Sequence, residues 1–251
     1  MYPVLFKIGP FAAHAYGFML ALAFTLGILT SIYFAKKEGI RSETILNLAI
    51  YVIISAIAGA RLLYVLVDWN YFSGHPFEII MVQNGGLAFL GGLLLSLLII
   101  FVYARLKKLP LLKILDAITP AGFLGYSITR IGCFLTGCCF GVPTRLPWGV
   151  VFPPGSPAAV AFPGAALHPV EIYASLTTFA IFLILAWIYR YNKFDGQIFF
   201  LGLIFYSIYR FLMEFMRFEP KWLSLSIYQW MVIPLFIFGV WGLSYFRRRP
   251  A

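Results

Sequence analysis

Hydrophobic residues run through seven stretches of this chain, and most of the charged residues lie in the short connections between them. A helix that crosses a membrane needs about 20 consecutive, mostly apolar residues, so each stretch is long enough to form one. The pattern therefore predicts about seven transmembrane helices joined by short loops. The predicted segments are 13–34, 45–67, 87–104, 111–133, 170–189, 197–215 and 226–246.

The segment 111–133 is the least apolar of these stretches. Asp116, Thr119 and Pro120 interrupt it, and Arg130 lies near its end. A proline inside a helix removes a backbone hydrogen bond, so we expect a kink at Pro120. Asp116 lies near the start of the segment, where its negative charge is expected to favour the dipole of the same helix.

The composition agrees with a membrane location. Hydrophobic residues make up 62% of the 251 residues and charged residues only 11%, and the mean hydropathy is +0.90. Too little polar surface remains to cover a water-soluble globule of this size. The segments also leave no room for a separate soluble domain. We therefore expect an all-α, polytopic integral membrane protein with a single transmembrane helical domain over residues 1–251.

The distribution of lysine and arginine predicts the orientation. Most of the 19 such residues lie in the connections after the first, third and fifth segments or in the C-terminal tail. Lys and Arg concentrate on the cytoplasmic side of membrane proteins, so the N-terminus is expected outside and the C-terminus in the cytoplasm. The net charge of +10 is then explained by the membrane and does not indicate a nucleic-acid partner.

In this orientation several polar residues inside the segments fall in the outer leaflet. Arg210 and Glu214 are four residues apart and therefore share a helix face. Charged residues inside a membrane are expensive unless they have a partner or a function. The outer-leaflet residues are Tyr16, Arg61, Arg130, His168, Glu171, Arg210 and Glu214.

Arg61, Arg130 and Arg210 are predicted at one depth on three different helices. Each one alone is explained as well by an ion pair, or by a side chain that reaches the interface, as by a binding role. Together the three cations outnumber the two carboxylates of that depth, Glu171 and Glu214. An anion is therefore missing, and the phosphate of a phospholipid is the expected one.

The three cysteines of the chain follow Arg130 in a glycine-rich turn, with the spacing C-x4-C-C. This is not a usual zinc spacing, so no metal site is expected. Packing of small residues in a tight turn explains at least two of the cysteines. A disulfide from Cys133 to Cys138 or Cys139 is the other interpretation, on an oxidising outer side.

Two pairs of glycines, Gly85 with Gly86 and Gly91 with Gly92, flank the start of the segment 87–104. Small residues allow close packing between transmembrane helices. The alternative is a re-entrant loop whose backbone N–H groups approach a lipid head group. The sequence leaves both interpretations open.

Taken in order, these residues resemble the prolipoprotein diacylglyceryl transferase family of bacterial inner-membrane enzymes. The resemblance covers nearly the whole chain. The residues that carry it are Ala15, Tyr16, Gly17, Gly59, Ala60, Arg61, Gly85, Gly86, Gly91, Gly92, Arg130, Ile131, Gly132, Gly141, His168, Pro169, Tyr173, Tyr206, Arg210, Glu214 and Arg217.

The resemblance implies a seven-helix enzyme that begins lipoprotein maturation. It would transfer the diacylglyceryl group of phosphatidylglycerol to the lipobox cysteine thiol of prolipoprotein signal peptides, forming a thioether, with no cofactor and no metal. The catalytic residues that it implies are Arg130, Arg210, Glu214 and Tyr16. The substrate-binding residues that it implies are Arg130, for phosphatidylglycerol, with Arg61, Tyr206, His168 and Gly141.

The chain departs from the family's pattern in the turn and at position 90. Thr129 replaces a glycine before the arginine, Cys133 and Thr136 replace asparagines, and Cys138 replaces a glutamate. Leu90 stands where many members have a histidine that is often proposed as the base. If the activity is retained, that histidine is not a universal base.

The base therefore stays open, with His168 and Glu171 as candidates. Two other functions also stay open. A transporter or flippase for an anionic lipid would need outer-leaflet arginines too, although the inner halves of the segments are almost uncharged. A membrane thiol oxidoreductase would use the three cysteines, although the chain has no C-x-x-C motif.

Overall fold

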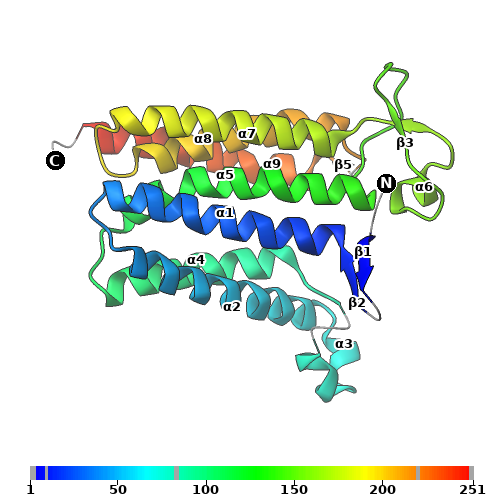
Figure 1. Cartoon of the computed structure of the whole chain (residues 1–251), viewed down its shortest axis with the longest axis horizontal. Helices are drawn as coiled ribbons and strands as arrows, with labels where there is room; N and C mark the ends of the chain where they lie inside the picture. The colour runs from blue at the N-terminus through cyan, green and yellow to red at the C-terminus, as the bar shows by residue number, and fades with distance from the viewer. Residues whose placement is uncertain (1–3, 9–10, 82–84, 219–220, 249–251) are drawn as a thin grey trace. The chain divides into compact units, whose positions relative to one another are not determined.

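The structure is a computed structural model that describes residues 4–8, 11–81, 85–218 and 221–248 (Figure 1). Long helices dominate it, and each corresponds to one of the seven predicted segments with ends that differ by a few residues. They are α1 (Ala15–Lys37), α2 (Ser42–Val67), α4 (Phe89–Leu106), α5 (Leu111–Thr136), α7 (Val170–Ile188), α8 (Gln197–Met213) and α9 (Ile227–Arg247).

By length and composition, six of these helices could cross a membrane. The seventh, α4, is a shorter apolar helix. The prediction of an all-α, multi-pass membrane protein is confirmed. The helix α5 continues through Pro120.

Short elements lie in the connections and were not predicted from the sequence. The elements are β1 (Val4–Ile8), β2 (Phe11–His14), α3 (Trp69–Phe72), η1 (Pro76–Ile80), β3 (Val150–Val151), α6 (Pro157–Ala161), β4 (Ala166–Leu167), η3 (Tyr189–Tyr191), η4 (Glu214–Met216), β5 (Lys221–Trp222) and β6 (Leu225–Ser226). The short strands pair antiparallel, β1 with β2, β3 with β4 and β5 with β6, and helix α6 lies in the connection between β3 and β4.

The chain divides into two compact units, and each is described by itself. Unit 1 comprises residues 1–34 and 115–251, and unit 2 comprises residues 35–114. The expectation of one transmembrane domain over the whole chain stays a prediction.

In unit 2 the helices α2 and α4 pack closely through glycine. A side-chain atom added at Gly59 would collide with the backbone of Gly91, and one added at Gly91 would collide with Gly59. The hydroxyls of Ser55 and Ser96 lie 3.3 Å apart across the same interface. Close helix packing, one of the two interpretations of the paired glycines, therefore holds for Gly91.

In unit 1 a buried carboxylate links α5 to the start of α8. Asp116 is fully buried and accepts hydrogen bonds from the backbone N–H groups of Gly196, at 2.7 Å, and Phe199, at 2.8 Å. The expectation that Asp116 serves the dipole of its own helix was therefore wrong. Its charge lies at the N-terminus of a different helix, where unpaired N–H groups are available.

Further contacts join α7 and α9 to this pair of helices. The hydroxyl of Ser127 on α5 donates to the carbonyl oxygen of Ser175 on α7 at 2.9 Å. Gly242 on α9 lies against the ring of Phe200 on α8, where a side chain would not fit. As a result, the C-terminal ends of α5 and α8 and the N-terminal ends of α7 and α9 lie at the same end of unit 1, on the right of Figure 1.

Candidate functional site

Polar residues gather at this end of unit 1. Arg130 lies in the last two turns of α5, Glu171 in the first turn of α7, and Arg210 in the last turn of α8. Glu214 follows α8 directly in η4, and Tyr16 lies in the first turn of α1. The structure thus brings together five of the polar residues that the sequence placed in the outer leaflet.

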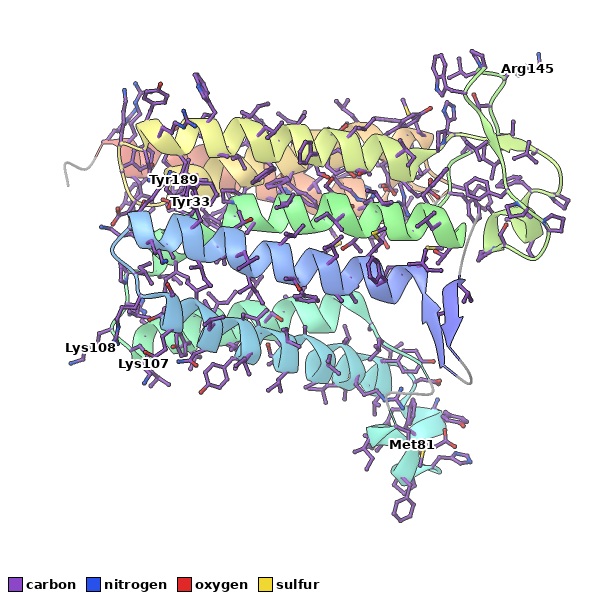
Figure 2. All side chains as sticks on the ribbon, in the orientation of Figure 1. Tyr33, Met81, Lys107, Lys108, Arg145 and Tyr189 are labelled. Atoms are coloured by element: carbon purple, nitrogen blue, oxygen red, sulfur yellow. The ribbon has the colours of Figure 1, made fainter. Side chains whose placement is uncertain are left out.

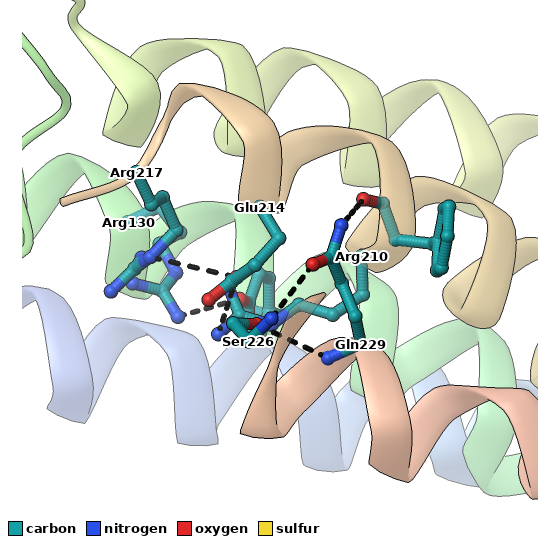
Figure 3. A network of polar contacts seen from close by, with 8 residues as sticks. Arg130, Arg210, Glu214, Arg217, Ser226 and Gln229 are labelled. Atoms are coloured by element: carbon teal, nitrogen blue, oxygen red, sulfur yellow. Dashed lines mark hydrogen bonds and ion pairs between the residues drawn. The ribbon is translucent and has the colours of Figure 1, made fainter. Parts of the chain in front are cut away.

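A buried carboxylate joins two arginines in this cluster (Figure 3). Glu214 Oε2 lies 3.1 Å from Arg210 Nη2 and 3.9 Å from Arg217 Nε. The Glu214 side chain is fully inaccessible to solvent, and Arg210 is also buried. The predicted pairing of Arg210 with Glu214 on one helix face is confirmed, and two cations share one carboxylate.

The start of α9 supports this group. The side chain of Gln229 donates to the carbonyl oxygen of Phe211 at 3.2 Å, and Ser226 and Gln229 form a capping box at the helix N-terminus. The guanidinium of Arg210 lies 4.5 Å from the centre of the Tyr228 ring. Sequence reasoning missed these residues, although the pattern Ser-x-x-Gln before an apolar stretch is a recognisable capping signal.

Arg130 has different surroundings. Its Nη2 donates to the hydroxyl of Tyr126 at 2.5 Å, and its guanidinium lies 4.5 Å from the centre of the same ring. Among the described residues no carboxylate lies within ion-pair distance of Arg130. Its positive charge is therefore not neutralised by a carboxylate of the described residues, and the expected phosphate partner stays a prediction.

Aromatic rings extend from Arg130 into the helices. The ring centre of Tyr126 lies 6.3 Å from that of Tyr209, which lies 6.2 Å from that of Tyr206. The predicted substrate-binding residue Tyr206 therefore belongs to the same group as Arg130. Tyr126 and Tyr209 were not singled out in the sequence, because single tyrosines in apolar helices carry no distinctive signal.

Tyr16 enters the site through a close contact between helices. A side-chain atom added at Gly132 would lie 3.3 Å from the Cα of Tyr16 and 3.1 Å from the Cβ of Met19. The glycine that follows Arg130 by two residues thus lets α1 approach α5. The side chain of Tyr16 is 41% exposed, so it can reach a ligand.

Gly141 and His168 hold the loops of the site together. Gly141 N–H donates to the carbonyl of His168 at 3.2 Å, and His168 N–H donates to that of Val142 at 3.1 Å. A side-chain atom added at Gly141 would lie 2.7 Å from the carbonyl oxygens of His168 and Met216. The position requires glycine for close backbone approach, so its contribution to substrate binding would be indirect.

Both candidate bases have buried polar atoms without a hydrogen bond in the described part of the chain. These atoms are Nδ1 of His168 and both carboxylate oxygens of Glu171. Glu171 is only 1% exposed. An unpaired carboxylate is costly in such a place, which favours a neutral, protonated Glu171 or one that meets a ligand.

The cysteine turn follows Arg130 at the end of α5. Cys133, Cys138 and Cys139 are free thiols, and their Sγ atoms lie within 4.8 Å of one another. Hydrogen bonds from the other two thiols, together with the positive charges of Arg130 and Arg217, lower the pKa of Cys139. The sequence allowed a disulfide from Cys133 to one of the other two, whereas the structure has three free thiols that converge.

Arg61 belongs to unit 2 and is surrounded by backbone carbonyls. Its guanidinium donates to the carbonyl oxygens of Ile79 at 2.9 Å, Gly85 at 2.7 Å and Gly86 at 3.1 Å, and also to that of Glu78. It is 7% exposed. These contacts join the loop after η1 to α2, and they occupy most of the donors of the side chain.

Leu90, also in unit 2, lies in the first turn of α4 and is 41% exposed. An aliphatic side chain cannot accept a proton, so position 90 supplies no base in this chain.

The fold and the site together define a class of protein: a multi-pass membrane protein with arginines, a buried carboxylate and tyrosines at one end of its helices. The family model for prolipoprotein diacylglyceryl transferase matches residues 3–245. The chain therefore belongs to the prolipoprotein diacylglyceryl transferase family, and it is a transferase. The resemblance expected from the sequence is confirmed.

Individual relatives agree with this assignment. The chain is 36% identical over 227 residues to the phosphatidylglycerol--prolipoprotein diacylglyceryl transferase of Finegoldia magna, covering 90% of this chain and 88% of the relative. It is 34% identical over 253 residues to the protein of the same name from Clostridium tetani, covering 99% and 100%. It is 33% identical over 248 residues to that of Synechococcus elongatus, covering 96% and 86%.

Proposed function

We propose that this chain transfers the diacylglyceryl group of phosphatidylglycerol to the lipobox cysteine of prolipoprotein signal peptides, the first step of bacterial lipoprotein maturation. The observation that carries the proposal is Arg130, whose charge has no carboxylate partner in the described structure, within a chain that belongs to the transferase family. Arginine binds carboxylate and phosphate through paired hydrogen bonds, and phosphate is the anion that a phospholipid head group offers.

The protein would act as a multi-pass protein of the bacterial inner membrane. The excess of lysine and arginine in alternate connections supports an outside N-terminus and a cytoplasmic C-terminus. In this orientation the site faces the outer leaflet, where a signal peptide emerges from the membrane.

In the proposed mechanism the arginines bind the phosphate. Arg130 and Arg210 would donate hydrogen bonds to its oxygens and stabilise the charge that develops as the bond between phosphate oxygen and glycerol carbon breaks. Glu214 would orient Arg210 through the 3.1 Å ion pair. Tyr16 would position the head group, and Tyr206 would line the site.

The nucleophile in this reaction is the peptide thiol. Its sulfur forms the new bond to the glycerol carbon, glycerol phosphate leaves, and the thiol proton passes to a base. His168 and Glu171 are the proposed acceptors, Glu171 in the ionised form that contact with a ligand would favour, because each has a buried polar atom without a hydrogen bond in the described structure. The arginines would also favour the thiolate over the thiol by their positive field. No metal or cofactor takes part in this scheme.

The other predicted binding residues would act indirectly. Gly141 and His168 join the loops around the site through their backbones. The donors of Arg61 are already engaged by carbonyl oxygens of unit 2, so a supporting role for Arg61 is better founded than a direct contact with substrate.

The direct test uses the purified protein, phosphatidylglycerol labelled in its acyl chains, and a lipobox peptide. Wild type should produce labelled thioether peptide, and Arg130→Ala should not. Arg145→Ala is the matched control, because Arg145 is exposed in the loop before β3, away from the helices of unit 1 (Figure 2).

The same assay separates the alternative functions. If the wild type binds labelled lipid and yields no labelled peptide, lipid transport becomes the better explanation. Full transfer by a variant with all three cysteines changed to serine would exclude a thiol oxidoreductase mechanism.

A further inference from the structure

All the thiols of the chain lie in one place. The Sγ atoms of Cys133, Cys138 and Cys139 lie within 4.8 Å of one another, and the chain has no other cysteine. Cys133 is buried, and Cys138 and Cys139 are partly buried. Packing of small residues does not require their sulfur atoms to converge.

The turn that ends α5 produces this convergence. Cys138 N–H donates to the carbonyl of Cys133 at 3.2 Å, and Gly137 N–H donates to that of Phe134 at 3.2 Å. With Gly137 at a φ of 70°, these bonds form a Schellman motif, which folds Cys138 back over the last turn of the helix. The backbone thus places two sulfurs together.

The third sulfur comes from a residue in an unfavourable conformation. Cys139 has a φ of 64°, in the left-handed region that non-glycine residues avoid. Such a conformation costs free energy and is often associated with a functional site.

The spacing of the sulfurs suits a metal ion with three thiolate ligands. Because no two of the sulfurs are more than 4.8 Å apart, an ion between them can lie within about 2.8 Å of all three, close to the ~2.3 Å of a metal–thiolate bond. Small side-chain rotations would close the difference. Soft thiolate ligands select soft cations such as Cu(I), and the described residues place no fourth ligand with these sulfurs.

Nearby charges would balance such a site. Arg130 and Arg217 both act on Cys139 electrostatically. Three thiolates with one monovalent cation carry two negative charges, which Arg130 and Arg217 would offset in part, because Arg217 also lies 3.9 Å from Glu214. A thiolate cluster without this compensation would be unfavourable at the edge of a membrane.

We propose that Cys133, Cys138 and Cys139 form a trigonal thiolate site for a soft cation, with Cu(I) as the best match. The site goes beyond the proposed transfer reaction and does not depend on it. Its ligands are deprotonated when the metal binds, and three protons are released to solvent.

The experiment titrates Cu(I) into the purified, reduced full-length protein in competition with a chromophoric Cu(I) chelator. Wild type should retain about one Cu(I) per chain against the chelator, with three sulfur neighbours in the X-ray absorption spectrum. Cys133→Ser, Cys138→Ser and Cys139→Ser should each weaken binding by about tenfold or more. Thr129→Ala, on the same helix but with all sulfurs kept, should bind as wild type does.

Two results would overturn the proposal. One is Cu(I) retention that is unchanged in the single serine variants, which would place the ion elsewhere. The other is a protein that, when isolated without reductant, has one reactive thiol and recovers three after reduction, because a disulfide would then occupy two of the ligands.

An alkylation experiment on the wild type alone tests the site without relying on variants, which could misfold. Bound Cu(I) should protect the partly buried thiols of Cys138 and Cys139 from alkylation by a maleimide, whereas Mg²⁺ should protect neither. Alkylation at the same rate with and without Cu(I) would contradict the proposal. The transfer assay needs no added metal. A negative result in the Cu(I) experiments would therefore not contradict the proposed enzymatic function.

Discussion

Arg61 of unit 2 and Arg130 of unit 1 are both arginines within apolar helices, but their surroundings differ. Arg61 donates to backbone carbonyls of η1 and of the loop that follows it. Arg130 donates to the hydroxyl of Tyr126 and has no carboxylate within ion-pair distance among the described residues. A guanidinium that is already engaged can support a fold, whereas one with free donors can bind an anion. Residue type and depth alone do not separate the two roles.

The largest expected loss of activity comes from replacing Arg130. Arg130→Ala should lower kcat/KM for lipid transfer by about 100-fold or more, because a charged contact to the departing phosphate contributes about 3 kcal/mol to transition-state stabilisation. The melting temperature should fall only modestly, since the side chain loses the hydrogen bond to Tyr126 and the contact with its ring but no ion pair. The transfer assay and a thermal unfolding scan in detergent measure both quantities.

Arg61→Ala should show the opposite behaviour. The carbonyl oxygens of Ile79, Gly85 and Gly86 would lose their donor in a partly buried place, at a cost of about 1–3 kcal/mol in stability. The remaining folded protein should transfer lipid at a rate within about threefold of wild type. A loss of activity equal to that of Arg130→Ala, without a loss of stability, would show that Arg61 binds substrate directly.

The comparison also shows what the sequence could and could not predict. The seven helices were predicted with ends that differ by a few residues, because the thickness of a membrane requires about 20 apolar residues and every backbone group must be satisfied within the helix. The contact between Arg210 and Glu214 was predicted for a similar reason. Residues four apart meet on any helix, and the measured separation is 3.1 Å.

Partners that are distant in the sequence were not predictable in this way. Asp116 binds N–H groups of Gly196 and Phe199, at the start of a helix about 80 residues further along the chain. Arg61 finds carbonyl acceptors, and every residue has a carbonyl group, so no side-chain pattern identifies them. The convergence of the cysteines depends on two left-handed backbone conformations, at Gly137 and Cys139.

A smaller loss of activity is expected when the carboxylate of Glu214, which Arg210 and Arg217 share, is neutralised. Glu214→Gln keeps the shape of the side chain but removes the charge that holds Arg210 and Arg217. Arg210 should then lose its orientation, and kcat should fall by about 10- to 30-fold with a smaller change in KM. Arg210→Ala in the same background should add little further loss, because the two residues act as one unit. Full additivity of the two changes would contradict this coupling.

The smallest loss of activity is expected when the hydrogen bond between Arg130 and Tyr126 is removed. Tyr126→Phe removes the hydroxyl that accepts from Arg130 at 2.5 Å and keeps the ring under the guanidinium. Loss of one hydrogen bond of about 1 kcal/mol should lower kcat/KM by about fivefold. Tyr51→Phe, at an exposed position of α2 in unit 2, is the control for loss of a tyrosine hydroxyl. If Tyr126→Phe left transfer unchanged while Tyr126→Ala abolished it, the ring contact, and not the hydrogen bond, would be what positions Arg130 for the phosphate.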